Sequence, residues 1–291
     1  MLILLLVALG LGLFVGLRSG SGAASAPVKD HRVVHSVSTA RHRLPRTSTI
    51  KRLALPATLP ARTLSVPILM YHRIDKLRAT LPAITRALTV DPGDFAAQMR
   101  WLALHRFHTI TQEQLFAALE HGKRMPAKPI VITFDDGYRD VLYNAAPVMH
   151  RLGMHGTAYV ITSRISGSRT DPTFLTWLQL NALEQDGIEI GSHTVDHAEL
   201  PRLLDPAALQ ELIQSRHALE LHLHHPVQWF AYPAGKFDSR TEALVRQAGY
   251  VLAVTTQSGA LQDARLPFAL HRYEVLDTTG VRGVASLLGA S

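Results

Sequence analysis

Short apolar runs alternate with longer amphipathic segments along most of this 291-residue chain, and this alternation constrains the fold more than any other feature. A run such as PIVITF has the length and β-branched residues of a buried strand, whereas the segment NAAPVMHRLG behind it has the apolar spacing of a helix. The runs are VPILMYH (66–72), HTIT (108–111), PIVITF (129–134), GTAYVI (156–161), IEIGSH (188–193), VQWFAYP (227–233) and VLAVTT (251–256). Strands that alternate with helices form parallel sheets, so the pattern predicts an α/β fold, a closed or nearly closed barrel of about seven parallel strands.

The N-terminal part differs in character from the rest. Residues 1–17 are apolar and uncharged, and the small residues Ala24, Ser25 and Ala26 would suit signal cleavage. The stretch is long for a signal-peptide core and slightly short for a membrane span, so cleavage and anchoring both stay open. We expect a signal peptide or membrane anchor over residues 1–26, a basic flexible linker over 27–64 and one catalytic domain over 65–291. The protein is then exported to the periplasm or the extracellular space, where residues 1–17 would anchor an uncleaved chain to the inner membrane.

The positive charge is confined to the N-terminal part. Residues 1–62 contain nine Lys/Arg and a single acid, Asp30, whereas residues 63–291 contain 21 basic and 22 acidic residues. A basic segment behind an apolar N-terminus is typical of a tether that lies against anionic lipid or cell-wall polymer. The remainder has neither a basic excess nor a recognisable nucleic-acid-reading motif, so we expect no nucleic-acid partner.

Two adjacent carboxylates, Asp135 and Asp136, follow the apolar run 129–134 and precede Gly137. Asp-Gly behind such a run is also a strong hairpin signal, which would require a second strand directly after it. The residues that follow carry apolar side chains at helical spacing instead, with Gly153 as a stop. The order strand, DDG, helix places both carboxylates at the carboxyl end of a strand, where α/β folds position their chemistry.

A pair of histidines, His193 and His197, follows another predicted strand. At this spacing in a helical turn, two imidazoles lie roughly 5–6 Å apart and can share a metal ion. The spacing alone says little in a chain with 16 histidines. Because the chain contains no cysteine, however, any metal must be held by histidines and carboxylates. The histidines and the two aspartates all follow strands, so we expect them on the same edge of the barrel.

The segments TFDDGY, SHTVDH and FAYPAGKFD resemble, in order and spacing, the first three motifs of the NodB-homology polysaccharide deacetylases, carbohydrate esterase family 4. VPILMYHRI, DFAAQMRWLALHRFHTIT and AGYVLAVTT resemble the branch that includes poly-β-1,6-N-acetylglucosamine deacetylases. The similarity extends over residues 66–273. It implies a distorted (β/α) barrel of the NodB-homology type, so that residues 65–291 would form a polysaccharide deacetylase domain that removes acetyl groups with the help of a metal ion.

The resemblance also assigns roles to single residues. It implies that Asp136, His193 and His197 hold one divalent metal ion, usually zinc in this family, and that Asp135 is the general base. This division is physically reasonable, because one carboxylate is committed to the metal while its neighbour stays free to take a proton from the metal-activated water. The backbone N–H of Ala234, in the third motif, would stabilise the oxyanion.

Three points remain open at this stage. The general acid is either His72, at the end of the first strand, or His271 near the C-terminus, and we favour His72 from the resemblance and its strand-end position. Many family members brace the catalytic aspartate with an arginine two residues before the motif proline, but this chain has Ala231 there. Tyr138 is a candidate residue of the substrate pocket, although buried aromatic residues are common in barrels.

The sequence thus predicts an exported hydrolase that removes N-acetyl groups from an N-acetylglucosamine polymer. The polymer is either a β-1,6-linked exopolysaccharide or the glycan of peptidoglycan. The alternative is a non-catalytic carbohydrate-binding barrel that keeps the deacetylase fold. The base and all three metal ligands are present, which argues against that alternative, whereas Ala231 argues for it.

Overall fold

The computed structural model describes residues 51–165 and 173–289. The predicted signal peptide or anchor, over residues 1–26, and the linker up to residue 50 lie outside the described residues. Within the two described ranges, none of the helices combines the length and the apolar character that a membrane crossing requires.

Seven parallel strands form the central sheet, which confirms the predicted number, but only six of them come from the predicted apolar runs, because residues 273–274 form the seventh. Their order across the sheet is β10 (Leu252–Val254), β9 (Trp229–Ala231), β8 (Ile188–Ser192), β7 (Gly156–Val160), β6 (Pro129–Phe134), β2 (Ile68–Tyr71) and β12 (Tyr273–Glu274). A short strand, β5 (His108–Thr109), pairs with the beginning of β6. Because all seven strands run in one direction, their carboxyl ends form one edge of the sheet, here called the carboxyl rim, and their amino ends form the amino rim.

The sheet curls into a half-barrel, which confirms the predicted distorted barrel. Its two edge strands, β10 and β12, are connected through a single bridge between Val254 and Leu270 rather than through a continuous ladder. Leu270 lies on the segment that leads into β12 and exchanges backbone hydrogen bonds with Ala253 and Thr255. The residues that follow Leu270 therefore lie where the two edge strands of the half-barrel, β10 and β12, approach each other. This place is here called the seam.

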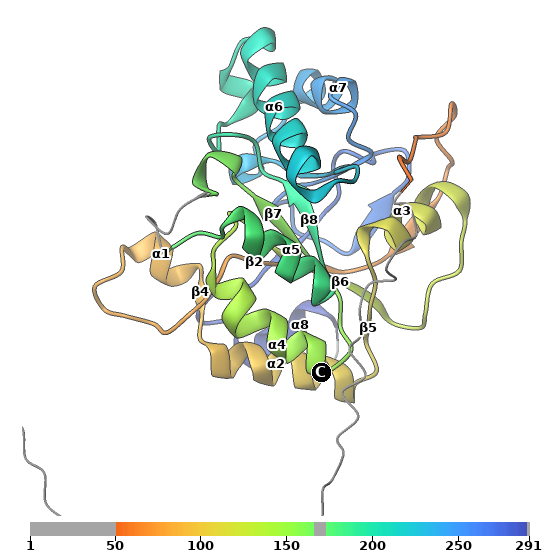
Figure 1. Cartoon of the computed structure of the whole chain (residues 1–291). Coiled ribbons are helices and arrows are strands. Elements are labelled where there is room, and N and C mark those ends of the chain that lie inside the picture. Colours follow the sequence, from red (N-terminus) through yellow and green to blue (C-terminus); the bar gives the residue numbers. More distant parts are fainter. Residues whose placement is uncertain (1–50, 166–172, 290–291) are drawn as a thin grey trace, which may run out of the picture. The chain divides into compact units, whose positions relative to one another are not determined.

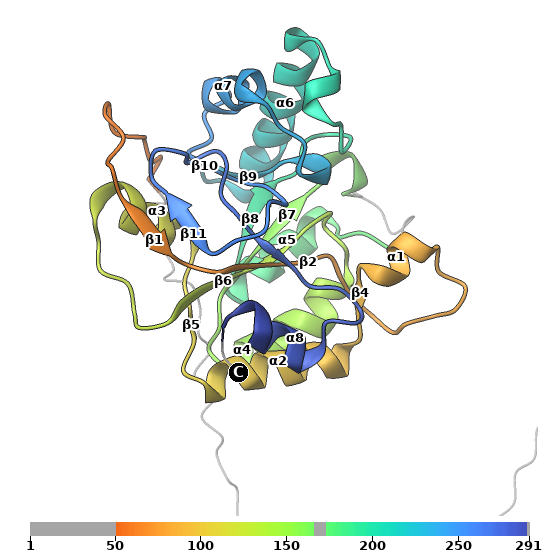
Figure 2. The ribbon, with the colours of Figure 1, turned by 180° about the vertical axis from the view of Figure 1, so that it is seen from behind.

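Helices cover the outer face of the sheet (Figures 1 and 2). On one side, α2 packs beside α8 and α4; on the other, α6 packs beside α7. The helices are α1 (Ala83–Ala87), α2 (Pro92–Leu104), α3 (Gln112–His121), α4 (Ala146–Arg151), α5 (Trp177–Gln185), α6 (Asp205–Leu223), α7 (Ser239–Gln247) and α8 (Gly280–Leu287). Shorter helical turns are η1 (Val141–Ala145, a π-helical turn), η2 (Thr162–Arg164), η3 (Leu200–Arg202) and η4 (Pro233–Gly235).

Polar side chains cap the beginnings of two helices. Thr111 caps α3, because its side chain accepts from the Gln114 N–H while the Gln114 side chain accepts from the Thr111 N–H. At α7 the cap is Asp238, whose carboxylate accepts from the Thr241 N–H at 2.7 Å. An aspartate competes well for this position because an ionised acceptor forms the stronger bond.

Strand β6 shows how the two faces of the sheet differ. Ile130, Ile132 and Phe134 pack in the core beneath the helices. Val131 points to the opposite side and packs in the interior of the half-barrel. Side chains alternate along a strand, so Thr133 also faces the interior, where its hydroxyl donates to the Leu69 carbonyl at 2.8 Å. The interior is therefore partly polar.

The folded domain begins before residue 65, so the linker predicted over residues 27–64 is wrong for its last part. β1 (Thr63–Ser65) pairs antiparallel with β11 (Leu261–Asp263). Further upstream, the backbone N–H and carbonyl of Leu53 bond to the Gln228 side-chain amide at 2.6 and 2.8 Å. The basic composition of this segment masked its contacts, because they are made by backbone groups and apolar side chains. Two further strands, β3 (Arg73–Ile74) and β4 (Thr89–Val90), form a separate parallel pair.

Candidate metal and catalytic site

The two adjacent aspartates at the end of β6 point to different sides of the backbone. Asp135 continues the alternation of β6 and enters the buried interior, whereas Asp136 adopts a left-handed backbone with φ of 72°. Gly137 follows with φ of 80°, and a β-carbon on it would lie 3.1 Å from Val160 Cβ. The glycine is therefore required by both the turn and the close approach to β7. This turn separates two like charges that are neighbours in sequence.

Asp136 meets the two predicted histidine ligands at the carboxyl rim. One carboxylate oxygen lies 3.5 Å from His193 Nε2 and 3.6 Å from His197 Nε2. The three potential ligand atoms all lie within 4.8 Å of one another. A metal ion with bonds of roughly 2.0–2.2 Å to each ligand requires ligand atoms this close together. The structure thus brings Asp136, His193 and His197 together as a candidate divalent metal site.

His193 is held in the tautomer that metal binding requires. Its Nδ1 lies 2.8 Å from the Ala231 carbonyl, which can only accept, so Nδ1 carries the proton and Nε2 presents a lone pair towards Asp136. Burial lowers the pKa of His193, which keeps the ring neutral near neutral pH. Ala231 therefore contributes to the site through its backbone, although its side chain carries no function.

The segment from His193 to Ala198 is an irregular loop, which corrects the helical turn assumed for the HxxxH spacing. Thr194 and His197 have left-handed backbones with φ of 66° and 60°. Glu211 of α6 fixes the loop, because its carboxylate accepts from the N–H groups of Val195 and Asp196 at 2.9 and 3.0 Å. The two rings still meet, with centroids 4.8 Å apart, because the loop folds back on itself.

Arg272 supplies the brace for Asp135 that the sequence left open. It is fully buried, and its guanidinium donates to both carboxylate oxygens of Asp135 at 2.8 and 2.7 Å. Further donations to Thr133 Oγ1 at 3.1 Å and the Thr255 carbonyl at 2.8 Å fix its orientation. Burial alone would raise the pKa of Asp135, but the charge and hydrogen bonds of Arg272 outweigh it and bring the pKa to about 2.

Sequence reasoning missed Arg272, because it considered only the neighbouring histidine in ALHRYEV. Arginine is almost never fully buried without a partner, so an arginine beside a short C-terminal strand indicates a buried ion pair. The partner could be identified only in three dimensions. Arg272 lies at the seam of the half-barrel, where it reaches Asp135 across the interior from the side opposite to Ala231.

The two candidates for the general acid lie in different surroundings. His72 directly follows β2, and its charge acts on both Asp135 and His197, so it belongs to the same cluster. Its Nδ1 is buried and has no hydrogen-bond partner among the described residues. His271 instead packs beside Gly259, and its backbone is held by the Gln262 side chain. The geometry favours His72, whose assignment remains a prediction.

Ala234 and Tyr138 lie at the same rim. Ala234 is exposed in turn η4 with a left-handed backbone, φ 51°, and the following Gly235 packs so tightly on Thr256 that a β-carbon would collide with it. Tyr138 stacks on Phe174 with ring centroids 5.0 Å apart. Together with Asp136, His197 and two further residues, this aromatic pair lines a pocket of about 210 Å³. The oxyanion and pocket roles of Ala234 and Tyr138 stay predictions.

Comparison with known proteins identifies the family. The polysaccharide deacetylase family model matches residues 122–253, which include the aspartate pair, both histidines and turn η4. YxkH of Bacillus subtilis, whose name assigns it to the polysaccharide deacetylases, is 33% identical over 76% of this chain and 74% of its own length. The chain belongs to the polysaccharide deacetylase family.

Two further relatives of this family member are informative. The poly-β-1,6-N-acetyl-D-glucosamine N-deacetylase of Staphylococcus epidermidis is 25% identical over 72% of this chain and 80% of its own length. The solved structure of the Streptococcus pyogenes deacetylase PplD, in complex with acetate, matches with a TM-score of 0.70 at 25% identity. That match covers 78% of this chain and 99% of PplD. The domain therefore corresponds to nearly the whole of a known deacetylase.

Proposed function

We propose that the protein is a metal-dependent N-deacetylase that hydrolyses the acetamido groups of an N-acetylglucosamine-containing polysaccharide. The observation that carries the proposal is the division of labour between two adjacent carboxylates. Asp136 faces His193 and His197, whereas Asp135 is paired with Arg272 in the interior. A purely carbohydrate-binding barrel would have no use for a buried, ionised carboxylate beside a three-ligand cluster.

The three ligand residues fit a divalent cation, because they combine one carboxylate with two imidazoles and His193 presents its Nε2 lone pair to the cluster. Zinc is the ion we propose, since two imidazoles and a carboxylate are ligands it prefers. When bound, such an ion supplies Lewis acidity towards water and towards the acetyl carbonyl oxygen.

Asp135 is proposed to take the proton from the water molecule that attacks the acetyl carbonyl carbon. Arg272 holds its two oxygens in one orientation and keeps the carboxylate ionised. The low pKa that this pairing produces makes Asp135 a base that is ready over the whole neutral range. The backbone N–H of Ala234, an exposed residue of turn η4, is proposed to donate to the oxyanion of the tetrahedral intermediate.

His72 is proposed to donate a proton to the departing amine nitrogen as the amide C–N bond breaks. One water molecule is consumed, and the products are acetate and the free amino sugar residue of the polymer. Tyr138 and Phe174 provide a stacked aromatic wall beside Asp136, which suits the apolar face of a sugar ring.

The name of the Staphylococcus epidermidis relative supports β-1,6-linked poly-N-acetylglucosamine as the first substrate to test, with peptidoglycan glycan as the second. Both polymers lie outside the cytoplasm. We therefore propose that residues 1–26 direct the protein out of the cytoplasm, where it acts as an anchored or released enzyme.

Acetate release tests the function. The full chain is incubated with β-1,6-linked N-acetylglucosamine oligomers and with peptidoglycan glycan strands, with chelator and then with added zinc. We expect acetate from at least one substrate, loss of release with chelator and recovery with zinc. No release from either substrate under any of these conditions would favour the non-catalytic carbohydrate-binding barrel.

Two variants separate the proposed base from the proposed metal ligands. Asp135→Asn is expected to retain bound metal and to lose acetate release by at least about 10³-fold, because the base is gone. His193→Ala is expected to lose bound metal itself, as measured by elemental analysis. If Asp135→Asn released acetate at a near wild-type rate, the assignment of the base would be wrong.

A second pair of variants separates the candidate acids. His72→Ala should flatten the basic limb of the pH–rate profile and lower kcat by roughly 10²–10⁴-fold, while His271→Ala should leave the profile unchanged. The reverse result would assign the acid to His271 and would indicate that the loop carrying Gly259 opens during turnover.

A further inference from the structure

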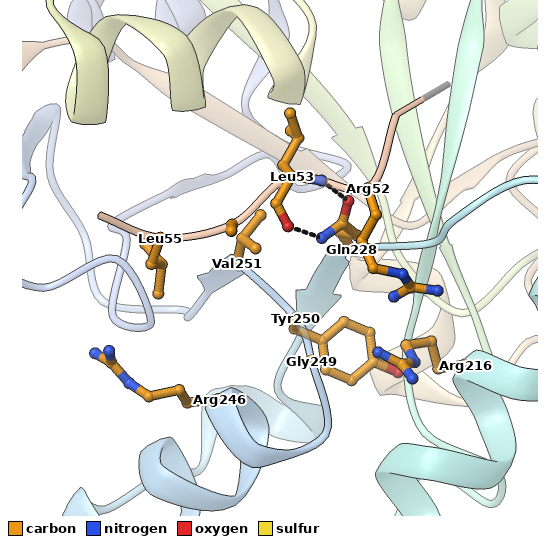
Figure 3. Close-up of a pocket in the computed structure, with 10 residues that line it drawn as sticks. Arg52, Leu53, Leu55, Arg216, Gln228, Arg246, Gly249, Tyr250 and Val251 are labelled. Atoms are coloured by element: carbon orange, nitrogen blue, oxygen red, sulfur yellow. Dashed lines mark hydrogen bonds between the residues drawn. The ribbon is translucent and has the colours of Figure 1, made fainter. Parts of the chain in front are cut away.

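A pocket of about 470 Å³ lies at the amino rim (Figure 3). Gln228 directly precedes β9 and Val251 directly precedes β10, while α6 and α7 contribute Arg216 and Arg246. Residues 52–55, at the beginning of the described chain, form another wall. The candidate metal ligands follow their strands at the carboxyl rim, so this amino-rim pocket lies at the opposite edge of the sheet and is a separate site.

Three arginines line the amino-rim pocket, and the described residues that line it include no aspartate or glutamate. In Figure 3 the guanidinium groups of Arg52 and Arg216 lie on one side and that of Arg246 lies on the other. Arg246 is exposed and rests on the ring of Phe268, 5.1 Å from its centroid. Three permanent cations thus surround a single cavity.

Carboxylates outside the pocket neutralise these cations only in part. Glu220 bonds to Arg52 at 3.0 Å, but its oxygen lies 3.8 Å from Arg216 Nε, beyond hydrogen-bond distance. That Nε atom is buried and has no hydrogen-bond partner among the described residues. Glu120 and Glu242 lie within charge range of Arg246. The pocket therefore holds at least one buried guanidinium donor, Arg216 Nε, that no described residue satisfies.

Gly249 makes room for one of these arginines. Its backbone is left-handed, with φ of 87°, and a β-carbon at this position would collide with Arg216 Nη1. The guanidinium of Arg216 can therefore lie against the backbone directly before β10. Tyr250 holds the same turn against α6, because its hydroxyl donates to the Leu212 carbonyl at 3.0 Å. The conformation of this turn therefore leaves room for the Arg216 guanidinium.

The residues that line the amino-rim pocket indicate that its ligand is a phosphate ester. Guanidinium groups bind phosphate oxygens in a bidentate manner and are preferred at such sites. Leu55 and Val251 add an apolar wall that suits the glycerol or acyl part of an ester. The volume of about 470 Å³ lies within the range of small-molecule sites, roughly 300–1,000 Å³.

The place where the chain joins the domain indicates which phosphate ester this is. Leu53 is fastened to Gln228 beside the pocket, so everything that precedes residue 51 connects to the domain at the amino rim. Residues 1–62 carry nine basic residues against one acid, and residues 1–17 are apolar. Such a segment is attracted to anionic membranes, and it would hold the pocket close to the lipid headgroups.

We propose that the amino-rim pocket binds the phosphate of an anionic membrane lipid. The domain then meets the membrane with its amino rim, and the candidate metal site at the carboxyl rim faces away from the bilayer, towards polymer outside the cell membrane. The membrane contact is independent of the deacetylase chemistry.

Vesicle co-sedimentation of the full chain tests this proposal. The vesicles contain phosphatidylglycerol and phosphatidylcholine in a one-to-three ratio, or phosphatidylcholine alone. The double variant Arg216→Gln/Arg246→Gln is expected to bind the anionic vesicles roughly 10- to 30-fold more weakly than wild type, since each basic residue near the surface contributes about fivefold. The N-terminal segment is identical in both proteins, so it contributes equally to both measurements.

The matched control removes two exposed arginines elsewhere, Arg86→Gln/Arg100→Gln, and should change binding by less than about threefold. Should Arg216→Gln impair folding, Arg246→Gln alone is expected to lower binding by about fivefold, whereas Arg246→Lys, which keeps the charge but not the bidentate geometry, should lower it by less. Acetate release from soluble oligomers should be equal in all of these variants.

Equal losses in the pocket variant and the control would overturn the proposal, because they would show a non-specific effect of net charge. Calorimetric titration with glycerol 3-phosphate separates the two sources of a phosphate group. If this soluble ester bound wild type and not the pocket variant while vesicle binding stayed unchanged, the pocket would serve a soluble ligand and the membrane assignment would be wrong.

Discussion

The interior of the half-barrel contains two carboxylates in contrasting surroundings, Asp135 at the carboxyl end and Glu189 towards the amino end. Both face the interior of the half-barrel, where Asp135 is buried and Glu189 is partly buried. Asp135 is paired with Arg272 through two hydrogen bonds. Glu189 accepts from the Gln112 N–H at 2.7 Å and from the Thr157 hydroxyl at 3.3 Å, both neutral groups.

Because their partners differ, the pKa values of the two carboxylates shift in opposite directions. Burial raises the pKa of Glu189 to about 7, because its neutral donors do not compensate fully. Burial also acts on Asp135, yet the arginine brings its pKa to about 2. A shared buried environment therefore allows one carboxylate to stay ionised and another to take up a proton near neutral pH. The permanent cation decides which of the two occurs.

Replacing Arg272 should abolish the difference in ionisation between Asp135 and Glu189. Arg272→Met leaves Asp135 buried without a counter-charge, so we expect the free energy of unfolding to fall by about 3–5 kcal/mol. Acetate release should fall by at least about 10³-fold, because the base is neither oriented nor reliably ionised. Urea unfolding and acetate assays measure the two effects.

Arg265→Gln is the matched control for this prediction. Arg265 also pairs with an aspartate, Asp263, at 2.6 Å, but it is exposed at the surface. Its loss should leave both the free energy of unfolding and turnover close to those of wild type, because exposed ion pairs contribute little. Comparable losses in both variants would show that burial of the pair does not matter.

Replacing the other carboxylate should have a smaller and pH-dependent effect. Because the pKa of Glu189 is raised from 4.5 to about 7 by folding, wild type has its full stability from this residue below pH 4.5 and loses it as the pH rises through 7. Glu189→Gln cannot ionise. We expect it to be more stable than wild type by about 2–3 kcal/mol at pH 8, with the advantage disappearing near pH 4.5.

Urea unfolding from pH 4.5 to pH 8 measures this advantage. Glu274→Gln, which replaces an exposed carboxylate of β12, is the matched control and should show no comparable pH dependence. A constant difference between Glu189→Gln and wild type over this range would mean that Glu189 stays ionised in the folded protein.

The sequence predicted the sheet well, because the apolar runs are short, β-branched and separated by helical spacing. It also predicted the aspartates and histidines of the carboxyl rim, since each follows a strand and its motif is local. Its helical turn between His193 and His197 was wrong, because Glu211 of α6 holds this segment as a loop through contacts 15 and 16 residues away in sequence.

Arg272 could not be predicted as the partner of Asp135 for a related reason. The two residues are 137 positions apart, and their contact depends on how the last strand closes the half-barrel. The contacts of residues 51–64 were missed because they are made largely by backbone groups, which composition does not reveal. Local patterns thus predict where chemistry lies, while distant pairings determine how it is held.

Glu184 is intermediate between Asp135, which has a permanent cation as its partner, and Glu189, which has only neutral partners. Glu184 lies 2.8 Å from His225 Nε2 in a half-buried pair between α5 and the turn before β9, and a histidine is a cation that titrates. Burial alone would lower the pKa of His225, but the hydrogen bond and charge of Glu184 outweigh it and raise the pKa above 6.5. The pair therefore stabilises the fold fully below pH 6.5, and this stabilisation is lost as the pH rises through the raised value.

His225→Gln should be less stable than wild type by about 1 kcal/mol at pH 5.5 and equal to it at alkaline pH, as measured by urea unfolding. His222→Gln, at an exposed histidine on the end of α6, should show no such convergence. If the His225 difference persisted unchanged at alkaline pH, the contribution would come from packing rather than from charge, and the rule drawn from Asp135 and Glu189 would not extend to titratable cations.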